Sequence, residues 1–160
     1  MFTVDSIKRK LQRIRLPVPD YKFSWNNWVP KKVSIVAWRA EKNRLPTMDV
    51  LARRSIYCIS DLCAFCGEVE ESCEHTFVSC PFVRSLWQVI GQWCKVQAIY
   101  AFSFWDLLGL HDSINGSKNK RKAFRSIPLT TIWCVWRRRN DVVFNRALVS
   151  LAKALKKQRP

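Results

Sequence analysis

Four residues in the middle of the chain constrain its fold more than any other feature: Cys63, Cys66, His75 and Cys80, in the order Cys-x2-Cys-x8-His-x4-Cys. Two cysteines separated by two residues can direct both thiolates from one tight turn toward a single ion, and the histidine and the last cysteine can complete a tetrahedron. Gly67 follows the cysteine pair directly and eases such a turn. The spacing therefore predicts a zinc site.

Three thiolates and one imidazole fill the four positions of a tetrahedral zinc ion and leave none for water, so the predicted zinc is structural and not catalytic. Two alternatives stay open. The four residues could be small buried cysteines and an ordinary histidine, and Cys58 and Cys73 lie close enough in the sequence to compete as ligands. Cys94 and Cys134 fall within apolar helical patterns, and we interpret both as core residues.

The segments around this motif have the apolar periodicity of helices. Residues 56–80 lack that periodicity, and no alternating strand pattern of useful length or internal repeat occurs. The expected fold is mainly α: a small helical domain held together by a Cys-Cys-His-Cys zinc knuckle. The predicted helices are 31–44, 48–54 with Thr47 as N-cap, 82–93 after Pro81, 104–108 with Ser103 as N-cap, and 129–145 with Pro128 at its start or at a kink, with residues 111–122 as a polar loop.

Positive charge is concentrated in the two ends of the chain. The chain has 28 Lys and Arg residues against 12 Asp and Glu residues, for a net charge of +16. Residues 1–54 carry +9 and residues 111–160 carry +11, whereas residues 55–110 carry −4. Such a charge attracts polyanions, which makes RNA or DNA the expected partner, ahead of an anionic membrane surface or an acidic protein. The alternative is an ordinary solvated surface that keeps the chain soluble.

Three thiolates and one zinc ion add further negative charge to the acidic middle segment. Phosphate contacts are therefore expected from the basic flanks and not from the zinc knuckle. The candidate nucleic-acid-binding residues are Lys31, Lys32, Arg53, Arg54, Lys120, Arg121, Lys122, Arg137, Arg138 and Arg139. Most of the eight tryptophans lie in helical patterns and are interpreted as core, but Trp25 and Trp28 are the better candidates for stacking on bases.

The sequence does not favour a membrane protein or an enzyme. The longest uncharged stretches, residues 96–105 and 126–136, are shorter than the roughly 20 apolar residues of a membrane helix. His111 is the other histidine, and no nucleophile pattern surrounds it. We expect a reducing intracellular compartment, either nucleus or cytoplasm, where seven cysteines indicate metal binding before disulfides.

Several segments of the chain together resemble a known protein family. The segments FSWNNWVPKKVSIVAWRAEKNRLPTMDVLARRSI (23–56) and CAFCGEVEESCEHTFVSC (63–80) resemble the plant reverse-transcriptase zinc-binding domain. The resemblance continues in the helix with Trp87 and Trp93 and, more weakly, in IWCVWRRRNDVVF (132–144). That domain lies at the carboxyl end of LINE-type non-LTR retrotransposon polyproteins. The resemblance implies a zinc-dependent helical module with a role in nucleic-acid binding, and it places Cys63, Cys66, His75 and Cys80 on the ligand pattern of the family.

The catalytic motifs of such elements are missing. No Asp-Asp pair is present to hold polymerase magnesium, and no endonuclease or RNase H carboxylate cluster is found. We therefore expect a non-catalytic module, with a reverse transcriptase domain as a further candidate partner. The alternative is a protein-interaction scaffold or a vestigial retroelement fragment. The expected organisation is a basic arm (1–20), the zinc-binding domain (21–95), a helical extension (96–146) and a basic tail (147–160).

Overall fold

Helices make up nearly all of the regular structure. The structure is a computed structural model that describes residues 23–56, 60–96, 99, 101–112 and 114–145. The predicted arm (1–20) and tail (147–160) lie outside these residues. Within them, one isolated bridge joins Leu62 to Glu70 and no strand forms, which confirms the mainly α prediction. The elements are α2 (Lys31–Glu41), α3 (Met48–Arg53), the π-helical turn η1 (His75–Ser79), α4 (Pro81–Trp93), α5 (Phe104–Gly109) and α6 (Lys118–Asn145).

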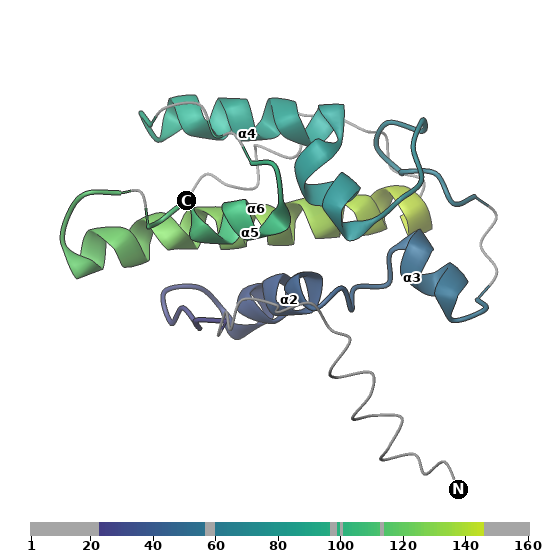
Figure 1. The fold of residues 1–160 in the computed structure, drawn as a ribbon, viewed down its shortest axis with the longest axis horizontal. Coiled ribbons are helices and arrows are strands. Elements are labelled where there is room, and N and C mark those ends of the chain that lie inside the picture. The colour runs from purple at the N-terminus through teal and green to yellow at the C-terminus, as the bar shows by residue number, and fades with distance from the viewer. Residues whose placement is uncertain (1–22, 57–59, 97–98, 100, 113, 146–160) are drawn as a thin grey trace, which may run out of the picture.

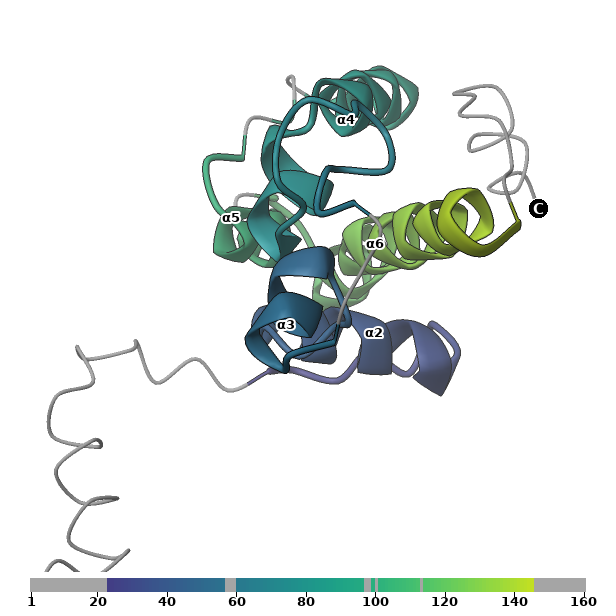
Figure 2. The same cartoon turned by 90° about the vertical axis from the view of Figure 1, so that its right-hand side faces the viewer.

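Helix α6 is the central element. In both views it lies between α4 on one side and α2 on the other (Figures 1 and 2). Helix α2 packs directly on α6, and α5 contacts both α6 and η1. The helical extension is therefore packed against the segment that carries the zinc motif. None of the described helices is both long and apolar enough to cross a membrane.

The α6 helix begins earlier than the sequence predicted. The structure places residues 118–122, which were expected to be loop, in the first turns of a 28-residue helix, and Pro128 lies inside it. Proline removes one backbone hydrogen bond and is usually costly in a helix interior. Pro128 is fully packed here, and Asn26 donates a side-chain hydrogen bond to the Lys122 carbonyl, so tertiary contacts hold the amino-terminal turns.

Several helix boundaries depend on residues other than glycine. Helix α2 ends at Glu41, three residues before the prediction, because Asn43 adopts a positive φ of 50°. The Asn43 and Arg44 amides then donate to the carbonyls of Ala40 and Arg39, which closes a Schellman motif. The ends of α3 and α4 use Ser55 and Lys95 in the same conformation. Helix α5 begins with the predicted N-cap Ser103, which forms a capping box with Asp106.

Phe77 connects the zinc-binding segment to the helical core. Its side chain is completely buried in η1, and its ring centroid lies 5.6 Å from that of Phe104 in α5 and 6.5 Å from that of Trp136 in α6. The Trp87 indole of α4 donates a 2.9 Å hydrogen bond to the Phe77 carbonyl. Cys63 and Cys80 belong to the same buried cluster. Phe77 thus links the turn that begins at His75 to the packing of three helices.

Candidate metal centre

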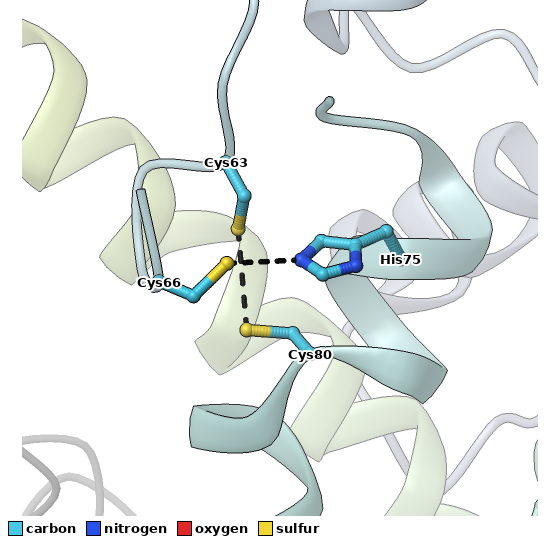
Figure 3. A group of neighbouring side chains, drawn as sticks. All are labelled: Cys63, Cys66, His75 and Cys80. Carbon is cyan, nitrogen blue, oxygen red and sulfur yellow. Dashed lines mark hydrogen bonds between the residues drawn. The ribbon is translucent and has the colours of Figure 1, made fainter. Parts of the chain in front are cut away.

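The four predicted ligands converge on one point. The candidate ligand atoms of Cys63, Cys66, His75 and Cys80 all lie within 4.8 Å of one another (Figure 3). The Cys63 and Cys80 sulfurs are 4.0 Å apart, and the Cys66 sulfur is 3.3 Å from His75 Nε2. An ideal tetrahedral zinc site has sulfur–sulfur separations of about 3.8 Å and sulfur–nitrogen separations of about 3.6 Å, from its usual bond lengths. The residues fit zinc with four protein ligands.

The first two ligands come from a tight turn. The Cys63 amide donates to the Val69 carbonyl at 2.8 Å, and the Gly67 amide donates to the Cys63 carbonyl at 2.8 Å. Gly67 has a φ of 70°, which confirms the role expected for glycine after the cysteine pair. The Phe65 amide lies 3.4 Å from the Cys63 sulfur and donates to it. Such a bond stabilises a thiolate and positions it for a metal ion.

The other two ligands lie at the two ends of the π-helical turn, which was not predicted from the sequence: His75 begins it and Cys80 directly follows it. The Cys80 amide donates to the His75 carbonyl at 2.8 Å, five residues away in sequence. A π turn widens the helix, so residues five apart lie on the same side, as the x4 spacing requires. Pro81 then begins α4 directly after the last ligand. The His-x4-Cys spacing was the available signal for this turn.

Ser79 sets the orientation of the histidine ring. Its hydroxyl lies 3.3 Å from His75 Nδ1, while His75 Nε2 faces the Cys66 sulfur. A hydroxyl that accepts from Nδ1–H leaves the Nε2 lone pair free for a metal ion. Burial lowers the pKa of His75 and favours the neutral imidazole that a metal requires.

The Cys63 thiol donates a hydrogen bond to the Cys80 sulfur, 4.0 Å away. The hydrogen bond with Cys80, together with burial, raises the pKa of Cys63, and the same hydrogen bond lowers the pKa of Cys80. Without metal, the Cys63 sulfur therefore keeps its proton. A bound zinc ion replaces that proton, so zinc binding releases protons and weakens in acid.

The comparison with known families bears directly on this geometry. A family model described as zinc-binding in reverse transcriptase matches residues 2–87, which is more than half of the 160-residue chain. The chain belongs to this family. The matched range contains Cys63, Cys66, His75 and Cys80, which supports zinc as the metal of this group. The plant and LINE-type context stays a prediction, and no curated protein or solved structure matches the chain.

One of the two competing cysteines, Cys73, bonds a partner outside the ligand group. Cys73 is buried in this zinc-binding domain, but its thiol donates to the Ala40 carbonyl at 3.4 Å, and it is not among the grouped ligand residues. Burial, with a smaller effect of nearby carboxylates, raises its pKa to about 12. Cys94 packs against the core, Cys134 is only partly buried, and Cys58 lies outside the described residues.

A buried ion pair lies beside the zinc-binding loop. The guanidinium of Arg139 in α6 donates to both carboxylate oxygens of Glu71, at 2.7 and 2.6 Å. The exposed fractions of the two side chains are 1% for Arg139 and 0% for Glu71. Glu71 also accepts from the Met48 amide at 3.2 Å, so it caps α3, and the Thr47 hydroxyl bonds Asp49 instead. One carboxylate thus joins the loop, α3 and α6.

This ion pair corrects one predicted site residue. Arg139 was predicted to contact phosphates, but it is buried and both of its carboxylate-facing nitrogens are paired with Glu71. Its role is structural. The other predicted basic residues are more accessible: Lys31, Lys32, Arg53, Arg54, Lys120, Arg121 and Arg137 are exposed, and Lys122 and Arg138 are half-buried.

The structure brings some of these basic residues together on the packed pair of α2 and α6. Lys32 of α2 and Arg137 of α6 both lie over the Trp133 ring, at 5.6 and 5.8 Å from its centroid. Arg53 is placed differently, since it forms an ion pair of 2.9 Å with Asp49 in α3. The positive charge of Arg53 is therefore partly neutralised.

Proposed function

We propose that this chain is a non-catalytic module whose zinc-dependent fold presents a basic surface to RNA or DNA. One observation carries the proposal: five of the predicted phosphate-binding residues are exposed on α2 and α6, two helices that pack on each other. They are Lys31, Lys32, Lys120, Arg121 and Arg137. Lysine and arginine side chains on a surface of high positive charge bind phosphates with little dependence on base sequence.

The zinc centre supports a structural role for the metal. Four protein ligands complete a tetrahedral zinc ion, whereas catalytic zinc sites keep a position for water or substrate. His111, the other histidine, has its Nδ1 2.9 Å from the Leu108 carbonyl and its Nε2 3.4 Å from Asp112. These contacts fit a helix-end histidine and do not pair it with a nucleophile.

Charge reversal on the α2–α6 pair tests this proposal. A double variant in which both Lys32 and Arg137 are replaced by glutamate should bind a 20-nucleotide probe more weakly. It should also lower the slope of log affinity against log salt by about 2, since each lost phosphate contact removes about one unit. Affinity is measured by fluorescence anisotropy at several salt concentrations, with the zinc-loaded full chain.

A matched control separates a local surface from overall charge. Arg84 and Lys95 are also exposed, but they belong to the acidic middle of the chain, and replacing both with glutamate changes the net charge by the same amount. Equal losses in the two double variants would contradict a binding surface on α2 and α6. If the wild type does not bind at low salt, the alternative of a protein-interaction scaffold is favoured, for which the exposed Trp93 and Phe102 are suitable apolar contacts.

A further inference from the structure

A short segment before α2, residues 25–28, holds two tryptophans on the surface in a fixed position. We call it the tryptophan loop. The exposed fractions of Trp25 and Trp28 are 58% and 54%, whereas that of Asn26 between them is 5%. The Asn26 amide nitrogen donates to the Lys122 carbonyl and to the Ser126 hydroxyl, both at 3.1 Å. Its amide oxygen accepts from the Trp28 backbone at 2.9 Å, so Asn26 fixes the loop on α6.

Basic residues adjoin the tryptophan loop at both of its ends. Its anchor on α6 is the carbonyl of Lys122 itself, in the turn that also carries Lys120 and Arg121, both exposed. On the other side, Pro30 leads directly into α2, whose first residues are the exposed Lys31 and Lys32. Exposed positive charge therefore lies on both helices that adjoin the tryptophan loop.

The Trp25 ring is held in place by its neighbours and still keeps more than half of its surface open. Its centroid is 5.2 Å from the Phe23 ring in an edge arrangement and 6.4 Å from the Trp38 ring of α2. An exposed indole that is already ordered loses little conformational entropy when a flat ligand stacks on it. Water contact with two large aromatic rings is unfavourable, and a stacking ligand removes it.

We propose that the tryptophan loop, with Lys31, Lys32, Lys120 and Arg121 around it, is a binding site for single-stranded nucleic acid. Bases stack on Trp25 and Trp28 while the basic side chains contact the phosphates. Single strands fit this combination because their base faces are free, whereas the base faces of a duplex are already stacked on one another. This inference rests on the proposed function and specifies its ligand.

The test uses Trp28, because replacing Trp25 would also disturb its contacts with Phe23 and Trp38. Affinities of the zinc-loaded full chain are measured for a 15-nucleotide oligothymidine and for a duplex of the same length. Replacing Trp28 with leucine keeps an apolar side chain and removes the aromatic face. It should lower single-strand affinity about tenfold, change duplex affinity less than twofold and leave the salt slope unchanged, because stacking releases no counterions.

Two further variants make the result specific. Trp28→Phe keeps a ring and should retain most of the single-strand affinity. Trp93→Leu removes another exposed tryptophan, from the end of α4, and should have no effect. Zinc content and the far-UV circular dichroism of each variant establish that the fold is retained.

The outcomes separate this inference from the proposed function. If Trp28→Leu binds single strands as the wild type does while the Lys32 and Arg137 reversal weakens binding, the stacking site is wrong and the phosphate-binding function stands. A wild type that binds duplex as tightly as single strands also overturns the stacking site. A wild type that binds neither probe at low salt overturns both proposals.

Discussion

Replacing Cys66 with serine is expected to abolish stoichiometric zinc binding and to unfold the helical domain. Cys66 supplies one of the four ligand atoms that lie within 4.8 Å of one another. Structural zinc sites contribute on the order of 10–16 kcal/mol of apparent binding free energy, and the free energy of unfolding of a domain is about 5–15 kcal/mol. Zinc content by mass spectrometry and far-UV circular dichroism measure the two effects.

Cys73 provides the matched control for this variant. It is buried and lies two residues before the ligand His75, but its thiol bonds the Ala40 carbonyl and not the ligand group. The Cys73→Ser protein should keep one zinc per chain and its helical spectrum. A Cys66→Ser protein that keeps one zinc, or a Cys73→Ser protein that loses it, would show that the ligand assignment is wrong.

Replacing Arg139 with methionine is expected to lower the free energy of unfolding by about 3–5 kcal/mol, because it leaves the buried Glu71 carboxylate without its partner. The exposed neighbour Arg137, replaced in the same way, should change the free energy by less than about 0.5 kcal/mol. Urea unfolding of the zinc-loaded proteins measures both values. Equal effects of the two substitutions would contradict a buried ion pair at Arg139.

The double substitution Glu71→Leu with Arg139→Met tests the cause of the effect. Removing both charges leaves no unpaired buried group, so the double variant should be more stable than the Arg139→Met protein. The Met48 amide, which Glu71 caps at 3.2 Å, then loses an acceptor, so part of the loss should remain. A double variant whose loss equals the sum of the two single losses would mean that the charges act independently.

The metal site was predictable because its signal is local. All four ligands lie within eighteen residues, and the Cys-x2-Cys and His-x4-Cys spacings reflect turn geometry. The π turn that satisfies the second spacing was not predicted, because no composition or periodicity marks a single π turn. The prediction of a loop at residues 111–122 was partly wrong, because residues 118–122 form the first turns of α6. Pro128 indicated that no helix would form before it. The packing of Pro128 and the hydrogen bond from Asn26 stabilise these turns.

The ion pair between Glu71 and Arg139 had no local signal. The two residues are 68 positions apart, one in an acidic segment and the other in a run of three arginines. From the sequence, Arg137, Arg138 and Arg139 are equivalent basic residues. Helix periodicity within α6 makes one of them buried and one exposed, and only the packing of α6 on the zinc-binding loop decides which.

The central claim is that the chain holds zinc in a closed site with three sulfur ligands and one nitrogen ligand. X-ray absorption at the zinc edge of the zinc-loaded full chain tests this claim most directly. The structure predicts three sulfurs at about 2.3 Å and one nitrogen at about 2.0 Å. Fewer than three sulfurs, or an oxygen in the zinc coordination, would contradict the account, because the metal would then have either a different ligand set or an open position.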